Sequence, residues 1–104
     1  MAQLSWSLTA LDSLDAIAAY IERDSPLYAA TLIQRVFEAS RALSSFPRMG
    51  RVVPEFQNET LRELVFQGYR IVYSIDGDEV RVILVLHSAR DLREQLPDEP
   101  WSLR

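Results

Sequence analysis

The sequence predicts an α+β fold in which two helices pack on a mostly antiparallel, four-stranded sheet, in the order β-α-α-β-β-β. Three observations predict it. Residues 68–90 form two runs of β-branched and aromatic side chains around an Asp-Gly pair, which is typical of a β-hairpin. Residues 9–45 carry apolar side chains at helical spacing, interrupted once by Ser-Pro. Residues 3–7 alternate polar and apolar side chains, as a short strand does.

The length and composition are those of one small globular domain, and we expect residues 1–104 to form it, with residues 97–104 as an extended tail. The chain has no cysteine, which excludes disulfides and thiolate metal sites, and its single histidine is too little for another metal site. No apolar run is long enough to cross a bilayer, and the first residues lack the basic start of a signal peptide. We therefore expect a cytoplasmic protein with no cofactor and no membrane partner.

The charge bears on the choice of partner. The formal net charge is −4, and all eleven basic residues are arginines. An acidic domain has no general attraction for nucleic acid, so direct nucleic-acid binding is not expected of it. Six of the arginines fall between residues 48 and 90, which leaves room for a local cationic patch.

The helical region divides into an antiparallel pair. Thr9 is expected to cap the first helix, with Asp12 three residues later. Ser25 is expected to cap the second helix, with Pro26 in its first position, and this helix should run to about Ser45. Because the break between them is short, the two helices should lie side by side.

The chain after the helices is expected to return to the sheet. Residues 46–55 contain two prolines and a glycine and should form an irregular loop. Residues 61–66 should form a strand that turns at Gln67-Gly68 and pairs with the hairpin, which places Glu63 and Arg70 on the same face. After the hairpin, residues 91–96 should form a short helix.

The register of the hairpin follows from its turn. With Asp76 and Gly77 as the two turn residues, Tyr73 lies opposite Val80, and successive side chains alternate between two faces. One face is apolar and is expected to pack on the helices: Tyr69, Ile71, Tyr73, Val80, Val82, Leu84 and Leu86. The other mixes apolar side chains with cations and the only histidine: Arg70, Val72, Ser74, Glu79, Arg81, Ile83, Val85 and His87. Any chemistry is expected on this second face.

Four short segments in this order resemble the ParE/RelE superfamily of toxins from bacterial type II toxin–antitoxin modules: Pro47–Arg51, Leu61–Leu64, Tyr69–Tyr73 and His87–Arg90. The resemblance extends from Trp6 to Arg90 and implies the α+β fold described above. It also implies one of two activities, since RelE-like toxins cut messenger RNA on the ribosome and ParE-like toxins inhibit DNA gyrase. In both branches the resemblance implies a cognate antitoxin as partner.

The residues favour the ParE-like branch. RelE-like toxins place basic residues on the strand before the hairpin, and the matching positions here hold Leu61 and Glu63. Arg70 and Arg90 match two arginines of that branch, but a glutamate beside Arg70 cancels charge that a phosphate would need. The expected function is therefore gyrase inhibition. A ribonuclease that uses Glu63, Arg70, His87 and Arg90 remains the alternative, and a degenerate toxin that binds only its antitoxin is a third possibility.

The candidate target- or antitoxin-binding residues are seven: Arg62, Arg70, Arg81, Ile83, Val85, His87 and Arg90. Each has a structural alternative. Arg70 and Glu63 on adjacent strands can form an ion pair, and His87 can simply end its strand. Ile83 and Val85 would leave an exposed apolar strip, which is typical of a partner surface, unless the tail around Leu96 and Trp101 covers it.

Overall fold

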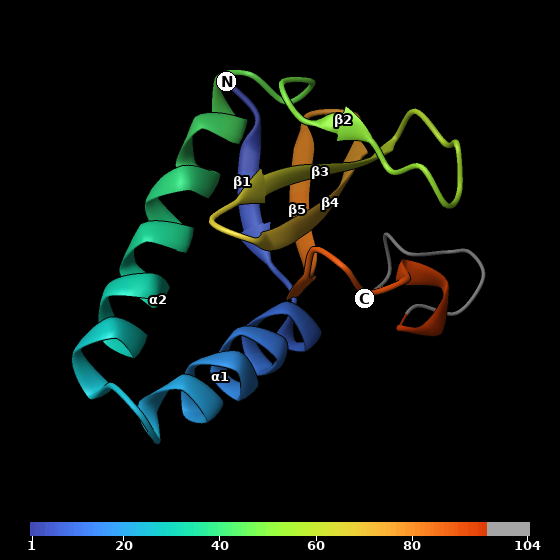
Figure 1. The fold of residues 1–104 in the computed structure, drawn as a ribbon. Helices are drawn as coiled ribbons and strands as arrows, with labels where there is room; N and C mark the ends of the chain where they lie inside the picture. Colours follow the sequence, from blue (N-terminus) through green and yellow to red (C-terminus); the bar gives the residue numbers. More distant parts are fainter. Residues whose placement is uncertain (96–104) are drawn as a thin grey trace.

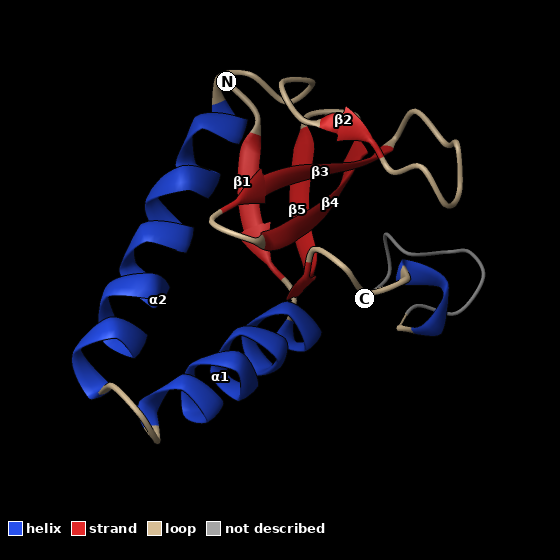
Figure 2. Cartoon of the chain, in the orientation of Figure 1, coloured by secondary structure: helices blue, strands red, loops and turns tan. Residues whose placement is uncertain are grey.

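The computed structural model describes residues 1–95 and confirms the α+β fold, with two helices on one side of a mostly antiparallel sheet (Figure 1). The sheet has five strands, in the order β1-β5-β4-β3-β2, and β1 runs parallel to β5 while the other neighbours are antiparallel (Figure 2). The elements are β1 (Gln3–Trp6), α1 (Leu8–Glu22), α2 (Pro26–Arg41), η1 (Ala42–Ser44), β2 (Arg51–Val52), β3 (Leu61–Phe66), β4 (Tyr69–Asp76), β5 (Glu79–His87) and η2 (Leu92–Glu94). The predicted tail, residues 97–104, lies outside the described residues.

The fifth strand corrects the prediction of an irregular loop over residues 46–55. β2 pairs with the middle of β3, where Arg51 lies opposite Glu63 and Val52 opposite Arg62. The strand is only two residues long, because Gly50 precedes it and Pro54 follows shortly after, and proline cannot donate to a ladder. This short edge strand brings Arg51 to the face of the sheet on which Glu63 lies.

Side-chain caps fix where the helices begin. Ser7, not Thr9, caps α1, since its Oγ accepts a hydrogen bond of 3.0 Å from the Ala10 amide. The chain is still extended at Ser7 when it leaves β1, and Thr9 already lies inside the helix. The predicted Ser25 cap and Pro26 at the start of α2 are confirmed. α2 ends at Arg41, and η1 carries the helical path on to Ser44, close to the predicted end.

The register of the β4–β5 hairpin differs from the prediction. Asp76 pairs with Glu79, so Gly77 and Asp78 form the turn, and Tyr73 lies opposite Val82 rather than Val80. A β-bulge between Val72 and Tyr73 then shifts the register again, with Ile83 as the extra residue on β5. A two-residue turn can be placed at Asp-Gly or at Gly-Asp, and a bulge leaves no signal in a run of apolar residues.

The bulge exchanges the two faces of β5 along its second half. Val85 now packs with the helix-side core and Leu84 and Leu86 pack on the outer face, the reverse of the prediction for these three residues. The helix-side core consists of Ala10, Leu14, Leu32, Val36, Leu43, Ile71, Tyr73, Val80, Val82 and Val85. We call the opposite side of the sheet the outer face; its core consists of Val53, Leu61, Val72, Ile83, Leu84, Leu86 and Leu92.

The outer face is covered rather than open. The chain between β2 and β3 contributes Val53 and Phe56, and η2, which lies within the helix expected over residues 91–96, contributes Leu92. The exposed strip predicted for Ile83 and Val85 is therefore wrong, because Ile83 is fully buried under this cover and Val85 is buried beneath the helices. The sequence suggested that the tail around Leu96 and Trp101 could cover this strip, and both residues lie outside the described residues.

Candidate functional site

The structure brings Arg70 and Glu63 together on the outer face, as the sequence predicted. Arg70 from β4 donates from Nε to Glu63 Oε1 on β3 at 2.6 Å. Both side chains are buried, and Arg70 is only 4% exposed. The cross-strand ion pair that was the structural alternative for these residues is thus confirmed.

A second carboxylate completes the coordination of Arg70. Glu55, in the chain between β2 and β3, accepts from both terminal nitrogens of the guanidinium at 2.7 Å, which is a bidentate pair. Arg70 Nη1 also donates to the Arg90 carbonyl at 2.9 Å. All three nitrogens of the guanidinium therefore hold acceptors, and Arg70 lines a pocket of about 330 Å³ together with Arg51 and Arg90.

The network extends to both ends of the site and is electrically balanced. Arg51 on β2 donates from Nε to Glu63 Oε2 at 2.6 Å, and the Leu92 amide donates to Glu55 Oε2 at 2.7 Å. We call Arg51, Glu55, Glu63 and Arg70 the outer-face cluster. Two guanidinium groups meet two carboxylates, and no buried side-chain nitrogen or oxygen among residues 1–95 lacks a hydrogen-bond partner. The cluster fixes the chain at residues 90–92 onto the sheet.

The cluster changes the acidity of its members. The guanidinium of Arg70, by hydrogen bonding, holds the pKa of Glu55 at about 2, well below its ordinary value of 4.5 and against the opposing effect of burial. The hydrogen bonds that Arg70 donates to Glu55 and to Glu63 raise the pKa of Arg70 above its ordinary value. Both groups therefore stay charged at neutral pH, and neither can serve as a proton-transfer group there.

His87 lies on the other side of the sheet. It pairs with Tyr69 at the end of β4–β5, and its ring meets the Tyr69 ring edge to face with centroids 5.8 Å apart. The bulge has turned it away from Glu63, so these two residues do not share the face that the ribonuclease alternative needs. His87 Nδ1 accepts from the Ala89 amide at 3.2 Å, which leaves Nε2 to carry the proton of the neutral ring.

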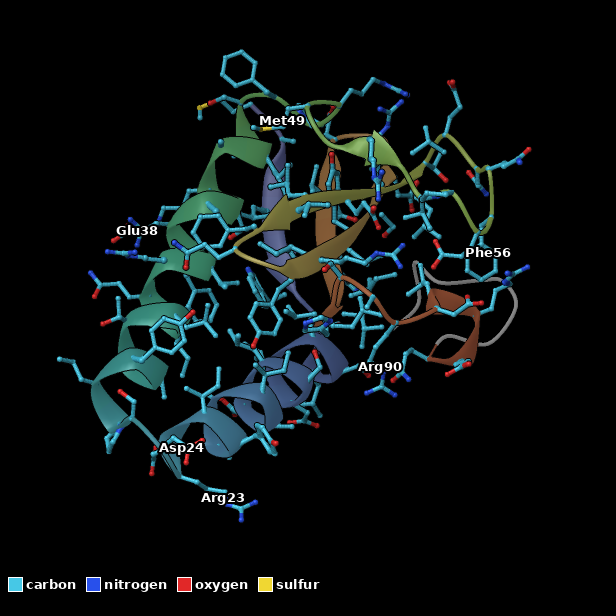
Figure 3. All side chains as sticks on the ribbon, in the orientation of Figure 1. Arg23, Asp24, Glu38, Met49, Phe56 and Arg90 are labelled. Carbon is cyan, nitrogen blue, oxygen red and sulfur yellow. The ribbon has the colours of Figure 1, made fainter. Side chains whose placement is uncertain are left out.

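A pocket of about 420 Å³ adjoins His87 at this end of the molecule. α1 contributes Ala16, Ile17 and Tyr20, and the sheet contributes Tyr69 and His87. Arg90 completes the lining, and Figure 3 shows it just beyond the sheet, beside α1. Its guanidinium is exposed, so of the two arginines matched to the RelE-like pattern this one alone remains open to an anion.

The other predicted site residues have structural roles. Arg62 donates from Nη1 to the Gly50 carbonyl at 2.9 Å and from Nε to the Glu59 carbonyl at 2.9 Å, so it fastens the loops on either side of β2. Arg81 donates to Ser5 Oγ at 3.3 Å, across the β1–β5 pair. Ile83 and Val85 are buried, which removes the reason for placing them on a partner surface.

Sequence reasoning missed Glu55 and Arg51. Both lie in a region expected to be irregular, and both reach the cluster through contacts over more than ten residues of sequence. One signal was available, because a buried arginine on a strand needs more acceptors than one carboxylate supplies. That signal calls for a second acid but does not say which one.

Among residues 1–95, no group of three or more histidine, cysteine, aspartate or glutamate side chains is arranged to hold a metal ion. Over the same residues, neither helix has the length and apolar content needed to span a bilayer.

Comparison with known proteins places this fold. The family model for the ParE toxin of the type II toxin–antitoxin system parDE matches residues 4–92. A putative toxin, Y4kP, of Sinorhizobium fredii is 39% identical over 88 residues, which cover 83% of this chain and 88% of that protein. Toxin RelE2 of Caulobacter vibrioides is 37% identical over 91 residues, which cover 86% of this chain and 99% of that protein.

Solved structures show the same fold. The chromosomal ParDE toxin–antitoxin system from P. aeruginosa superposes with a TM-score of 0.69 at 22% identity, over 84% of this chain and 96% of that one. The toxin–antitoxin complex RelBE2 from Mycobacterium tuberculosis gives a TM-score of 0.52 at 20% identity, over 86% of this chain and 93% of that one. The family-model match and the two relatives agree with the resemblance read from the sequence. The chain belongs to the ParE toxin family of type II toxin–antitoxin systems, within the ParE/RelE superfamily.

Proposed function

We propose that this toxin acts by inhibiting DNA gyrase and is neutralised by a cognate antitoxin. The observation that carries the proposal is the state of Arg70, which is buried and shared between Glu55 and Glu63. Cleavage of RNA by its 2′-hydroxyl needs cations on the phosphate, and a guanidinium already paired with two carboxylates cannot provide one. Binding to a protein target makes no such demand.

The remaining catalytic candidates also fit poorly with ribonuclease chemistry. Glu63 and His87 lie on opposite sides of the sheet, so they cannot act on one ribose as base and acid. The net charge of −4 gives no general attraction for ribosomal RNA. The antitoxin partner is supported separately, since both structural neighbours are toxin–antitoxin assemblies.

The test uses the purified toxin in two assays run in parallel. Gyrase supercoiling and the accumulation of gyrase cleavage complexes are measured against toxin concentration, and transcript cutting is followed on translating ribosomes. We expect gyrase inhibition that purified antitoxin reverses, with intact transcripts. Rapid transcript cutting without any effect on gyrase contradicts the proposal. If neither assay responds, the chain is a degenerate toxin that binds only its antitoxin.

One observation favours the ribonuclease as a second candidate. His87, Tyr69 and Arg90 line one pocket, so an imidazole lies in the same pocket as an open guanidinium. His87→Ala decides this candidate, because it should abolish cutting if the pocket is catalytic and leave gyrase inhibition unchanged otherwise. Arg41→Ala, which removes an exposed arginine from the last turn of α2, is the matched control.

A further inference from the structure

The loop between η1 and β2 is held more firmly than a connector requires. The buried Tyr73 hydroxyl accepts from the Gly50 amide at 3.0 Å and donates to the Pro47 carbonyl at 2.7 Å. Arg62 donates to the Gly50 carbonyl from the neighbouring strand. Gly50 itself has no space for a side chain, since a Cβ there would lie 2.5 Å from the Glu63 carbonyl oxygen. Side chains from β3 and β4 therefore fix the position of this loop.

The fixed loop presents apolar side chains to solvent. Phe46 is 65% exposed and Met49 52% exposed, although both lie beside well-packed structure. Together with Pro47 and Ile75 they line an open groove of about 610 Å³. More than half of the Phe46 side chain and of the Met49 side chain is therefore in contact with solvent in the free monomer. Aromatic and methionine side chains are enriched at protein interfaces. A loop whose backbone is already fixed loses less entropy on binding.

Charges at the two rims of the groove indicate what fits it. Arg48 lines one rim, and its contact with Glu59 is loose, at 3.9 Å between two exposed side chains. Gly77 lines the other rim, and its neighbours Asp76 and Asp78 are exposed in the same β4–β5 turn. The two aspartates would repel a nucleic-acid backbone. A protein surface with an apolar side chain between a carboxylate and a basic group complements both rims.

We propose that Phe46, Met49 and Arg48 form the surface by which this toxin docks on its target protein, with Phe46 as the anchor. The target is gyrase, and to this extent the inference rests on the proposed function. The surface is separate from the pocket beside His87. Figure 3 shows Met49 near the end of α2 and Arg90 beside α1, on different parts of the molecule.

The test compares a Phe46→Ala/Met49→Ala double variant, Arg48→Glu and wild type. Leu27→Ala is the matched control, since Leu27 is 79% exposed at the opposite end of α2. Gyrase inhibition, growth arrest after induction, antitoxin affinity and oligomeric state are measured for each. We expect the double variant to need roughly tenfold or more toxin for half-inhibition, as for loss of an interface anchor. Arg48→Glu should weaken inhibition less, and Leu27→Ala should inhibit like wild type. Antitoxin affinity and the urea midpoint should stay unchanged throughout, which shows that the variants fold.

The outcomes separate this inference from the proposed function. If wild type and the double variant inhibit gyrase equally, the docking surface is wrong and the function stands. If inhibition and antitoxin affinity fall together, or if the double variant changes oligomeric state, the groove binds the antitoxin or a second copy and the inference fails. If wild type arrests growth without affecting gyrase and the double variant does not arrest it, the surface stands and the gyrase target is wrong. If wild type affects neither gyrase nor growth, both the docking surface and the proposed function are wrong.

Discussion

The two faces of the sheet are buried by different means. On the helix side, α1 and α2 bring apolar side chains onto Ile71, Val80 and Val82, and no charged side chain belongs to that core. On the outer face, the chain between β2 and β3 and η2 cover an apolar core together with a buried ionic network. Most of the cover on the outer face is irregular chain, so it has few ladder or helix hydrogen bonds of its own.

The difference shows what each face depends on. The helix side is stabilised in proportion to the apolar area it buries, and its contribution does not change with pH. The outer face depends on a charge network in which Arg70 is the partner that both carboxylates share, so loss of Arg70 removes the main partner of two buried charges. Glu55 accepts from Arg70 and from the Leu92 amide, so the network also holds the start of η2 against the sheet.

Arg70→Met should cause the largest loss of stability. It removes the guanidinium that Glu63 and Glu55 share, and breaking a buried ion pair in this way costs about 3–5 kcal/mol in the free energy of unfolding. A triple variant that also carries Glu55→Met and Glu63→Leu should recover most of that loss, because an apolar cluster of similar volume needs no ionic partners. Urea denaturation measures both. If Arg70→Met alone is as stable as wild type, the ionic network does not stabilise the outer face.

Ile71→Ala probes the opposite side of the same strand. Ile71 is fully buried in the helix-side core, and truncation of a buried isoleucine to alanine costs about 2–5 kcal/mol. The loss should be the same at pH 7 and at pH 4, since no titratable group is removed. Urea denaturation at the two pH values checks this, and a loss that varies with pH would mean that the two faces are coupled.

The sequence predicted the parts of the fold that follow from local patterns, and it failed where the fold depends on a bulge or on contacts between distant segments. Apolar spacing in the helices and alternation in β3 and β4 predicted the α+β fold and the Arg70–Glu63 pair, because these signals are local. The outer-face cover depends on contacts between distant, irregular segments. Glu55 and Leu92 are 37 residues apart, and nothing in either neighbourhood specifies the other.

One residue accounts for most of the errors at the site. Ile83 is the extra residue of the bulge, and inserting it reverses which side of the sheet every later β5 side chain occupies. His87 thereby moved away from Glu63, and Val85 moved beneath the helices. In a strand buried on both faces, the apolar pattern is continuous, so the sequence does not reveal such a shift.

The acid sensitivity of the outer face should be visible in Glu55. Its folded pKa of about 2 lies below the ordinary 4.5, so its stabilising contribution is present above 4.5 and is lost as the pH falls toward 2. Wild type should therefore lose about 2–3 kcal/mol more than Glu55→Gln between pH 5 and pH 2. Denaturation profiles of the two proteins across this range check it. Glu59→Gln, which removes an exposed glutamate from the same loop, is the control and should follow wild type. If wild type and Glu55→Gln lose stability equally as the pH falls, Glu55 is not the source of the acid sensitivity.

Tyr73→Phe should cause the smallest loss of stability among these variants. The Tyr73 hydroxyl holds the exposed loop between η1 and β2. The substitution removes the hydroxyl that accepts from Gly50 and donates to Pro47 but keeps the buried ring. Leaving those two backbone groups without a partner should cost about 1–2 kcal/mol. Amide hydrogen exchange should become faster at Gly50 and stay unchanged at Val82, in the strand opposite. Because this loop carries Phe46, a looser loop should also weaken gyrase inhibition more than the stability loss alone explains, through lost preorganisation. Unchanged exchange at Gly50 would show that Arg62 alone is enough to hold the loop.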